Sequence, residues 1–233
     1  MKKWLLFLLM ALIFIGCSDD NEESQVKETS DQEEMTEETE DKEKALPETL
    51  TIPVTGTEDS ITIHLENAPL LGRYMAASGK QAKEMASSFK ARHLTDEAGG
   101  GLYMMSYACQ GDNRRCSYLL IQKGEEENTV PLTDLAVFVS YQLSPDMEKI
   151  MLFFERGQND TKTHDIQVVD LTEHKLLSLQ NEDLTEEVLN YNYPIEAMEW
   201  ADTDTIKVRV PSHVNLENSS HNLGEEFILF EVT

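Results

Sequence analysis

The sequence predicts a mainly β fold, built from antiparallel hairpin or meander modules with one short helix. Short runs rich in β-branched and aromatic residues, such as 166–169 and 227–230, are bounded by polar loops, as strands are. Ser144-Pro145-Asp146 is a turn sequence, because proline fixes φ and aspartate can accept hydrogen bonds from backbone amides two residues on. The same strand–turn–strand pattern then recurs along the chain. A β-sandwich or an α+β fold would give similar local patterns and stays open as an alternative.

Residues 1–16 read as a lipoprotein signal peptide. Two lysines precede an apolar run at 4–15, which as a helix would reach about 18 Å, well short of the ~30 Å hydrocarbon core. Such a run indicates an export signal rather than a membrane-spanning anchor. Its ending, Phe14-Ile15-Gly16-Cys17, resembles the bacterial lipobox, which implies cleavage before Cys17 and attachment of diacylglycerol and palmitate to that residue. Two acyl chains suffice for stable anchoring. The alternative is a secreted protein in which Cys17 is incidental.

Residues 17–48 form an acidic tether. Between Ser18 and Glu48 there are fourteen acidic and three basic residues, with four clearly apolar side chains. Such a segment cannot bury enough surface to offset its ordering entropy, so we expect disorder, extended by like-charge repulsion to at most about 100 Å. We interpret it as a spacer; an acidic tail that binds a basic partner is the alternative. The linker resembles those of Gram-positive lipoproteins, which implies the outer face of the cytoplasmic membrane.

The remaining residues, 49–233, carry thirty acidic and fourteen basic side chains, a net charge of −16. This charge argues against a nucleic-acid-binding protein, which needs a basic surface to neutralise phosphates. It also argues against a domain that lies flat on anionic lipid. The contact with the membrane is therefore expected through the anchor on Cys17.

Residues 50–77 contain three candidate strands, at 50–54, 60–65 and, with the sequence GRYMAA, at 72–77. We expect this region to form a further blade-like unit or to lend one strand to the last module. A helix is predicted from Ser78 to near Ser88, because Ser78 and Gln81 form a capping box. Helical spacing of apolar residues supports it, at Ala82, Met85, Ala86 and Phe89. Four cations make this the basic area of an acidic domain, as a solvated face or as a docking patch: Lys80, Lys83, Lys90 and Arg92.

Three weak repeats follow, at about 89–135, 138–180 and 195–233. Leu94, Leu143 and Trp200 mark equivalent strand ends, 49 and 57 residues apart, and such periods suggest blade-like modules. The second copy, LSPDMEKIMLFFERG followed by DIQVVDLTEHKLLSL, resembles a WD40-like (TolB-type) β-propeller repeat, with Met147 where that family has glycine. The resemblance implies a partial or small β-propeller-like fold. Three modules are fewer than the four that a propeller needs to close.

Cys109 and Cys116 lie at the two ends of a polar loop between apolar runs, where the strands of a hairpin would bring them face to face. Because the chain is expected to be exported, we predict a structural disulfide, which would stabilise the domain by roughly 2.5 kcal/mol. Free thiols are the main alternative. Redox-active pairs normally have CxxC spacing, and a zinc site would need further ligands nearby.

The sequence offers no convincing catalytic constellation. Ser87 and Lys90 fit S-x-x-K and 220–222 fits S-x-N, but the K-T-G motif of penicillin-binding enzymes is missing, so we interpret both as chance. The histidines are scattered, and Asp202 and Asp204 read as a turn rather than a calcium site. We therefore predict a non-enzymatic binding module with no cofactor or metal and with a protein partner in the cell envelope. Its contact loops would be 109–116, 156–164 and 211–222. A solute-binding lipoprotein of an importer or a cell-wall hydrolase is the alternative.

Overall fold

The computed structural model describes residues 46–79, 82–96, 100–111, 115–124, 126–157, 162–182, 188–211 and 227–233. The predicted signal peptide and nearly all of the predicted tether lie outside these residues. Residues from Lys44 onward form one compact unit.

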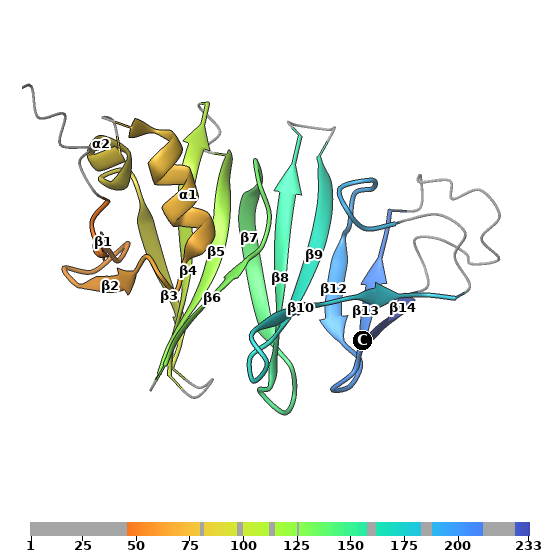
Figure 1. Cartoon of the computed structure of the whole chain (residues 1–233). Helices are drawn as coiled ribbons and strands as arrows, with labels where there is room; N and C mark the ends of the chain where they lie inside the picture. The colour runs from red at the N-terminus through yellow and green to blue at the C-terminus, as the bar shows by residue number, and fades with distance from the viewer. Residues whose placement is uncertain are drawn as a thin grey trace, which may run out of the picture. The chain divides into compact units, whose positions relative to one another are not determined.

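The described chain is mainly β, as predicted, with two helices (Figure 1). The helices are α1 (Pro69–Ala77) and α2 (Ala82–Ala86). The first strands are β1 (Thr49–Pro53), β2 (Ser60–His64), β3 (Lys90–Thr95), β4 (Gly101–Gln110), β5 (Arg115–Lys123), β6 (Glu127–Pro131) and β7 (Val137–Leu143). The later strands are β8 (Lys149–Arg156), β9 (Thr163–Asp170), β10 (Lys175–Leu177), β11 (Leu179–Gln180), β12 (Ala197–Trp200), β13 (Thr205–Arg209) and β14 (Ile228–Val232).

Three four-stranded antiparallel sheets carry the fold. The first has the order β3-β4-β5-β6 and the second β10-β9-β8-β7, so each is a meander of consecutive strands. The third has the order β11-β14-β13-β12, and β1 with β2 forms a separate two-stranded sheet. Most strands of the three larger sheets fall within the ranges expected for the three repeats, but β11 of the third sheet lies at the end of the second range.

The sheets pack face to face, because their central strands are buried on both sides. In β4, Met104 belongs to the core shared with the second sheet, whereas Met105 points the other way, into the core under the helices. The second sheet likewise contributes Phe154 to the core on one side and Val168 to the core on the other. Full burial of such side chains stabilises by about 1.5–3 kcal/mol each.

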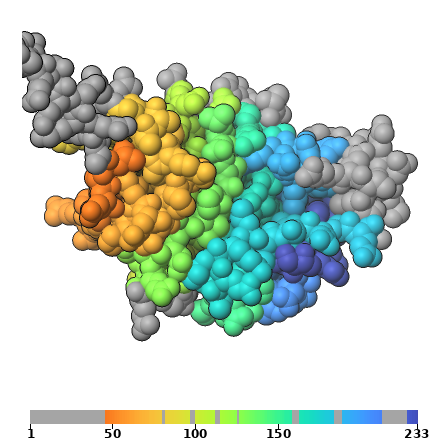
Figure 2. Space-filling view, in the orientation of Figure 1, coloured from red at the N-terminus to blue at the C-terminus, as the bar shows by residue number. Residues whose placement is uncertain are grey.

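The stack of three sheets has two outer faces, one on the first sheet and one on the third. The hairpin β1–β2 and the two helices cover the first sheet, as the orange and yellow region of Figure 2 shows. On the third sheet Ile206 and Val208 face the core, while Lys207 and Arg209 face away from it. Lys207 pairs there with Glu199 at 3.0 Å. Leu229, the cross-strand partner of Lys207, lies on the same face and is 54 % exposed, so this face is of mixed polarity. The described sheets form an open array and no closed barrel.

Two of the sequence-based expectations for residues 72–88 were wrong. Residues 72–77 are helical rather than extended, since Pro69 starts α1 at its first turn and Leu71 and Met75, one helical turn apart, are buried against the first sheet. Ser78 is not an N-cap, because it closes α1 and its Oγ donates to the Tyr74 carbonyl at 2.9 Å. Within the described part of the range predicted for the single helix lies only α2, which begins at Ala82 and ends at Ala86, so this helix is shorter than predicted.

The strand that completes the third sheet comes from β11, and not from residues 50–77 as the sequence suggested. β10 pairs with β9 and β11 pairs with β14, although only Ser178 separates them in the chain. Ser178 exchanges two backbone hydrogen bonds with Thr233, at 2.7 and 2.9 Å. In Figure 2 this segment, in cyan, lies beside the dark blue last strand. One extended segment therefore joins the second and third sheets.

The turn that resembled the propeller repeat is closed by side chains. Ser144 is 2 % exposed; its Oγ accepts a hydrogen bond from the Lys149 amide at 2.9 Å and donates to Asp146 Oδ1 at 2.5 Å. Met147 has φ +64°, the left-handed conformation that glycine adopts at least cost. Lys149 Nζ also lies 3.1 Å from Oδ1 of Asp204, in the equivalent turn of the third sheet.

Candidate interaction surface

Three of the connections between strands, one in each large sheet, leave from the same end. β4, β8 and β13 run in the same direction in Figure 1, and each is followed by one of the three loops that the sequence suggested as contact sites. At the opposite end lie tight turns, such as 144–148 and 201–204. The described residues at the loop stems are therefore the first place to look for a binding surface.

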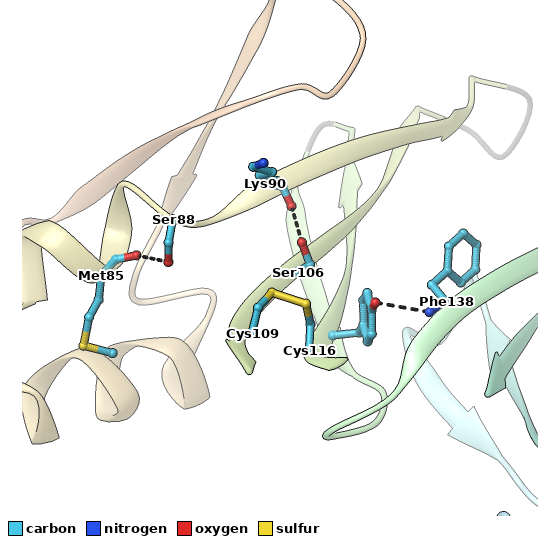
Figure 3. The surroundings of a disulfide bond; sticks show 8 residues. Met85, Ser88, Lys90, Ser106, Cys109, Cys116 and Phe138 are labelled. Carbon is cyan, nitrogen blue, oxygen red and sulfur yellow. Dashed lines mark hydrogen bonds between the residues drawn. A yellow bond between two sulfur atoms is a disulfide. The ribbon is translucent and has the colours of Figure 1, made fainter. Parts of the chain in front are cut away.

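The first stem is closed by the predicted disulfide, with the sulfur atoms of Cys109 and Cys116 2.04 Å apart (Figure 3). The strand register shifts here, since β4 carries one more residue than β5, and Ala108 takes a left-handed φ of +50° at this bulge. Cys116 also exchanges two backbone hydrogen bonds with Ala136, at 2.8 and 3.1 Å. The disulfide stem is thus fixed to the segment that enters the second sheet.

Arg156, at the second stem, is clamped between two segments distant in sequence. Its guanidinium carbon lies 3.7 Å from the ring centroid of Tyr191, and its Nη2 donates to the Asp134 carbonyl at 2.5 Å. The Tyr191 hydroxyl in turn lies 2.7 Å from Thr133 Oγ1. Burial is the main factor that raises the pKa of Tyr191 to about 12, so this hydroxyl stays neutral at physiological pH.

Beneath Arg156 lies a buried carboxylate. Asp165 is 3 % exposed, and its Oδ1 accepts a hydrogen bond from the Asn190 amide at 2.7 Å. Asn190 and Tyr191 both have left-handed φ values, 60° and 61°, and this bond helps to hold them. Burial raises the pKa of Asp165, while its hydrogen bonds and the charge of Arg156 act in the opposite direction.

His164 fixes the next part of the same segment. Its Nδ1 accepts a hydrogen bond from the Ile195 amide at 2.8 Å, so the neutral ring carries its proton on Nε2, 3.8 Å from Glu155 Oε2. The ring stacks on Phe153 at 4.8 Å. Burial lowers the pKa of His164, and Glu155 acts in the opposite direction.

These groups form what we call the stem cluster: Thr133, Glu155, Arg156, His164, Asp165 and Tyr191. Three of its polar contacts hold backbone of the segments 132–136 and 188–195, at the Asp134 carbonyl and at the Asn190 and Ile195 amides, which is the arrangement of a rigid support for loops. In the described part of the chain, no three histidine, cysteine or acidic side chains could together hold a metal ion. Sequence reasoning missed the cluster, because its members come from separate segments and form no motif; the doubly left-handed Asn190-Tyr191 gives no clear signal in a sequence.

A polar cleft of about 480 Å³ lies at the other end of the first sheet, beside the hairpin β1–β2. Its lining residues are His64, Glu66, Asn67, Lys123, Gly124, Glu126, Glu127 and Asn128. The Glu127 carboxylate, 6 % exposed, accepts from the His64 amide at 2.8 Å and from the Lys123 ammonium. The cleft joins residues about sixty positions apart, so no local sequence pattern could reveal it.

The other residues singled out in the sequence are dispersed. Ser87 Oγ donates to the Glu84 carbonyl at 2.6 Å, a local bond next to the helix end. Asp202 and Asp204 form the predicted turn, in which Asp202 Oδ1 accepts from the Asp204 amide at 2.8 Å. The four described histidines lie in or beside different strands: His64, His93, His164 and His174. Cys17 and residues 220–222 lie outside the described residues.

The chain was compared with known protein families, curated proteins and solved structures. No protein-family model matches the chain, and neither a curated protein nor a solved structure matches it significantly. Among the residues that the structure describes, none forms a helix long and apolar enough to cross a membrane.

Proposed function

We propose that this chain is a lipid-anchored, non-enzymatic binding module on the outer face of a bacterial cytoplasmic membrane. The lipobox-like 14–17 would supply the anchor on Cys17, and the acidic tether would hold the domain away from the bilayer. The three loops at one end of the sheets would contact a protein partner of the cell envelope. Loops that a rigid scaffold positions are the usual place for such contacts.

The observation that carries this proposal is the asymmetry between the two ends of the sheets. At one end the three candidate loops rise from stems fixed by a disulfide and by the stem cluster, whereas the other end carries tight turns closed by their own side chains. Rigid stems lower the entropy that a loop loses when it binds, so they favour affinity.

The test is to shorten one loop at a time and measure partner capture. Residues 158–161 can be replaced by Asn-Gly, which connects two antiparallel strands in a two-residue turn. The full chain is then cross-linked in its native membrane, and its partners are identified by mass spectrometry. We expect loss of the partner without loss of thermal stability.

The matched control alters the opposite end. Replacing residues Thr203 and Asp204 by Asn-Gly changes a tight turn of similar size and should leave partner capture intact. Equal capture by wild type and all three loop variants would exclude the loop end as the binding surface. Loss of capture in the control variant alone would place the surface at the turns.

A small-solute-binding lipoprotein remains the second candidate, and the polar cleft favours it. A cleft lined by Lys123, His64 and several carboxylates suits a small polar or cationic solute. A thermal-shift screen of polar metabolites separates the two candidates, because a ligand that binds the folded state raises its melting temperature. A shift that disappears in Glu127→Gln would favour the solute-binding function.

A further inference from the structure

The two cysteines of the disulfide lie in different surroundings. Cys109 is exposed at the loop end of β4, whereas Cys116 is 4 % exposed and belongs to the core shared by the first two sheets. Figure 3 shows the bridge between the neighbouring strands β4 and β5. A reagent in solution therefore reaches the Cys109 end of this bridge far more easily than the Cys116 end.

The backbone also holds the two cysteines unequally. Cys116 is fixed on both sides, because it lies opposite β4 and exchanges backbone hydrogen bonds with Ala136 at 2.8 and 3.1 Å. Ala108 and Cys109 together lie opposite Cys116, since the register of the two strands shifts at this point. Ala108 has a left-handed φ of +50°, which is costly for a residue with a side chain, so opening the bridge relieves backbone strain on this side. The Cys109 end is therefore the one that moves when the bridge opens.

We propose that this bridge is a site of thiol–disulfide exchange, in which a low-molecular-weight thiol of the cell envelope attacks Cys109. The thiolate sulfur of that molecule forms a new S–S bond with Cys109 Sγ, and the Cys109–Cys116 bond breaks. The electron pair of the broken bond goes to Cys116 Sγ, which takes up a proton from water. One disulfide replaces another, so the step needs no oxidant or reductant besides the thiol itself.

The bridge can close again after this step. Cys116 keeps its backbone position opposite Cys109, so its sulfur acts on the new disulfide at a high effective concentration. An apolar core solvates a thiolate poorly, so Cys116 either holds its proton or attacks Cys109 and expels the external thiol. The modification of Cys109 is thus reversible, and the bridge accepts thiols rather than catalysing exchange as a CxxC pair does. This inference does not depend on the partner proposed above.

Mass spectrometry of the full unreduced chain tests which sulfur is attacked, with reduced glutathione as the probe. After incubation under native conditions, N-ethylmaleimide in denaturant blocks the free thiols. Trypsin cleaves after Arg114 and Arg115, so Cys109 and Cys116 lie in separate peptides. Glutathione on Cys109 with maleimide on Cys116 should exceed the reverse arrangement by about tenfold. Equal amounts of the two products, an excess of the reverse one, or no glutathione on either cysteine would overturn the proposal.

A destabilised variant separates attack on the folded protein from attack on the unfolded chain. Ile206 is fully buried in the core of the third sheet, so Ile206→Ala leaves the bridge and its surroundings unchanged. If exchange needed unfolding, this variant would accelerate it by about thirtyfold or more, because the unfolded fraction rises by that factor. Attack on the folded protein predicts an unchanged rate of bridge opening, and an acceleration of this size would refute it. Ile206→Val gives the same comparison with a smaller loss of stability if the alanine variant does not fold.

Two single-cysteine variants form a matched pair for the last test. Cys116→Ser keeps the exposed thiol and Cys109→Ser keeps the buried one, while both lose the same covalent closure. With oxidised glutathione as the probe, the folded Cys116→Ser variant should form a mixed disulfide at least about tenfold faster than Cys109→Ser. Near-ultraviolet circular dichroism checks that both variants fold. Equal rates in the two folded variants would show that Cys109 is not the preferred point of attack.

Discussion

Met147 occupies a turn position that glycine would fill at lower cost, and Met147→Gly should stabilise the protein. The left-handed conformation costs an ordinary residue about 1–2 kcal/mol, and φ at Met147 is +64°. Glycine removes that cost but loses about 0.4–1 kcal/mol through the greater freedom of the unfolded chain. The Met147 side chain is 48 % exposed, so its removal forfeits little burial. The expected net gain is about 0.5–1 kcal/mol, or roughly 2 °C in Tm for a domain of this size.

Urea unfolding, followed by circular dichroism, measures this gain as a higher midpoint at unchanged slope. Met147→Ala is the matched control, since it removes the same side chain and keeps the cost of the left-handed backbone. The alanine variant should therefore be no more stable than the wild type. If the glycine variant is not more stable than the alanine variant, the turn carries no backbone cost and this reasoning is wrong.

Two further predictions concern the loop stems. Because burial lowers the folded-state pKa of His164, the unfolded chain takes up the proton first, and the free energy of unfolding should decrease as pH falls below about 6.5. His164→Asn, which keeps an acceptor for the Ile195 amide, should flatten that decrease in urea unfolding measured at several pH values; an unchanged slope would exclude His164 as its source. The double variant Cys109→Ser/Cys116→Ser should lose about 2.5 kcal/mol of stability. Labelling of both cysteines by a thiol reagent in the unreduced wild type would contradict the disulfide.

The sequence predicted the parts of this fold that depend on local pattern. The alternation of polar and apolar residues in strands, the Ser144-Pro145-Asp146 turn and the facing cysteines each depend on residues close together in the chain. The helix α1 was missed because Gly72 and two consecutive alanines follow only a short apolar run. The burial of Leu71 and Met75 against the first sheet stabilises the helical conformation of this segment. Tertiary packing of this kind overrides weak local propensity.

Features that join distant segments could not be predicted from the sequence. The stem cluster needs Thr133, Arg156 and Tyr191 to meet, and the strand β11 finds its partner only through the packing of the third sheet. A two-residue strand such as Leu179–Gln180 has no periodicity from which to predict it. Most strands of each sheet nevertheless lie within one expected module range, because each sheet consists mainly of strands that follow one another in the chain.

The segment that joins the second and third sheets also bears on the order in which a growing or translocating chain can fold. The first two sheets consist of consecutive strands, so each can close as soon as its own residues emerge. The third sheet cannot close early, because Leu179 pairs with Val232, 53 positions later in the chain. Until Val232 arrives, β11 extends from a finished sheet as an unpaired edge, the kind of surface on which chains aggregate. A chaperone that acts late on this chain would find its substrate there.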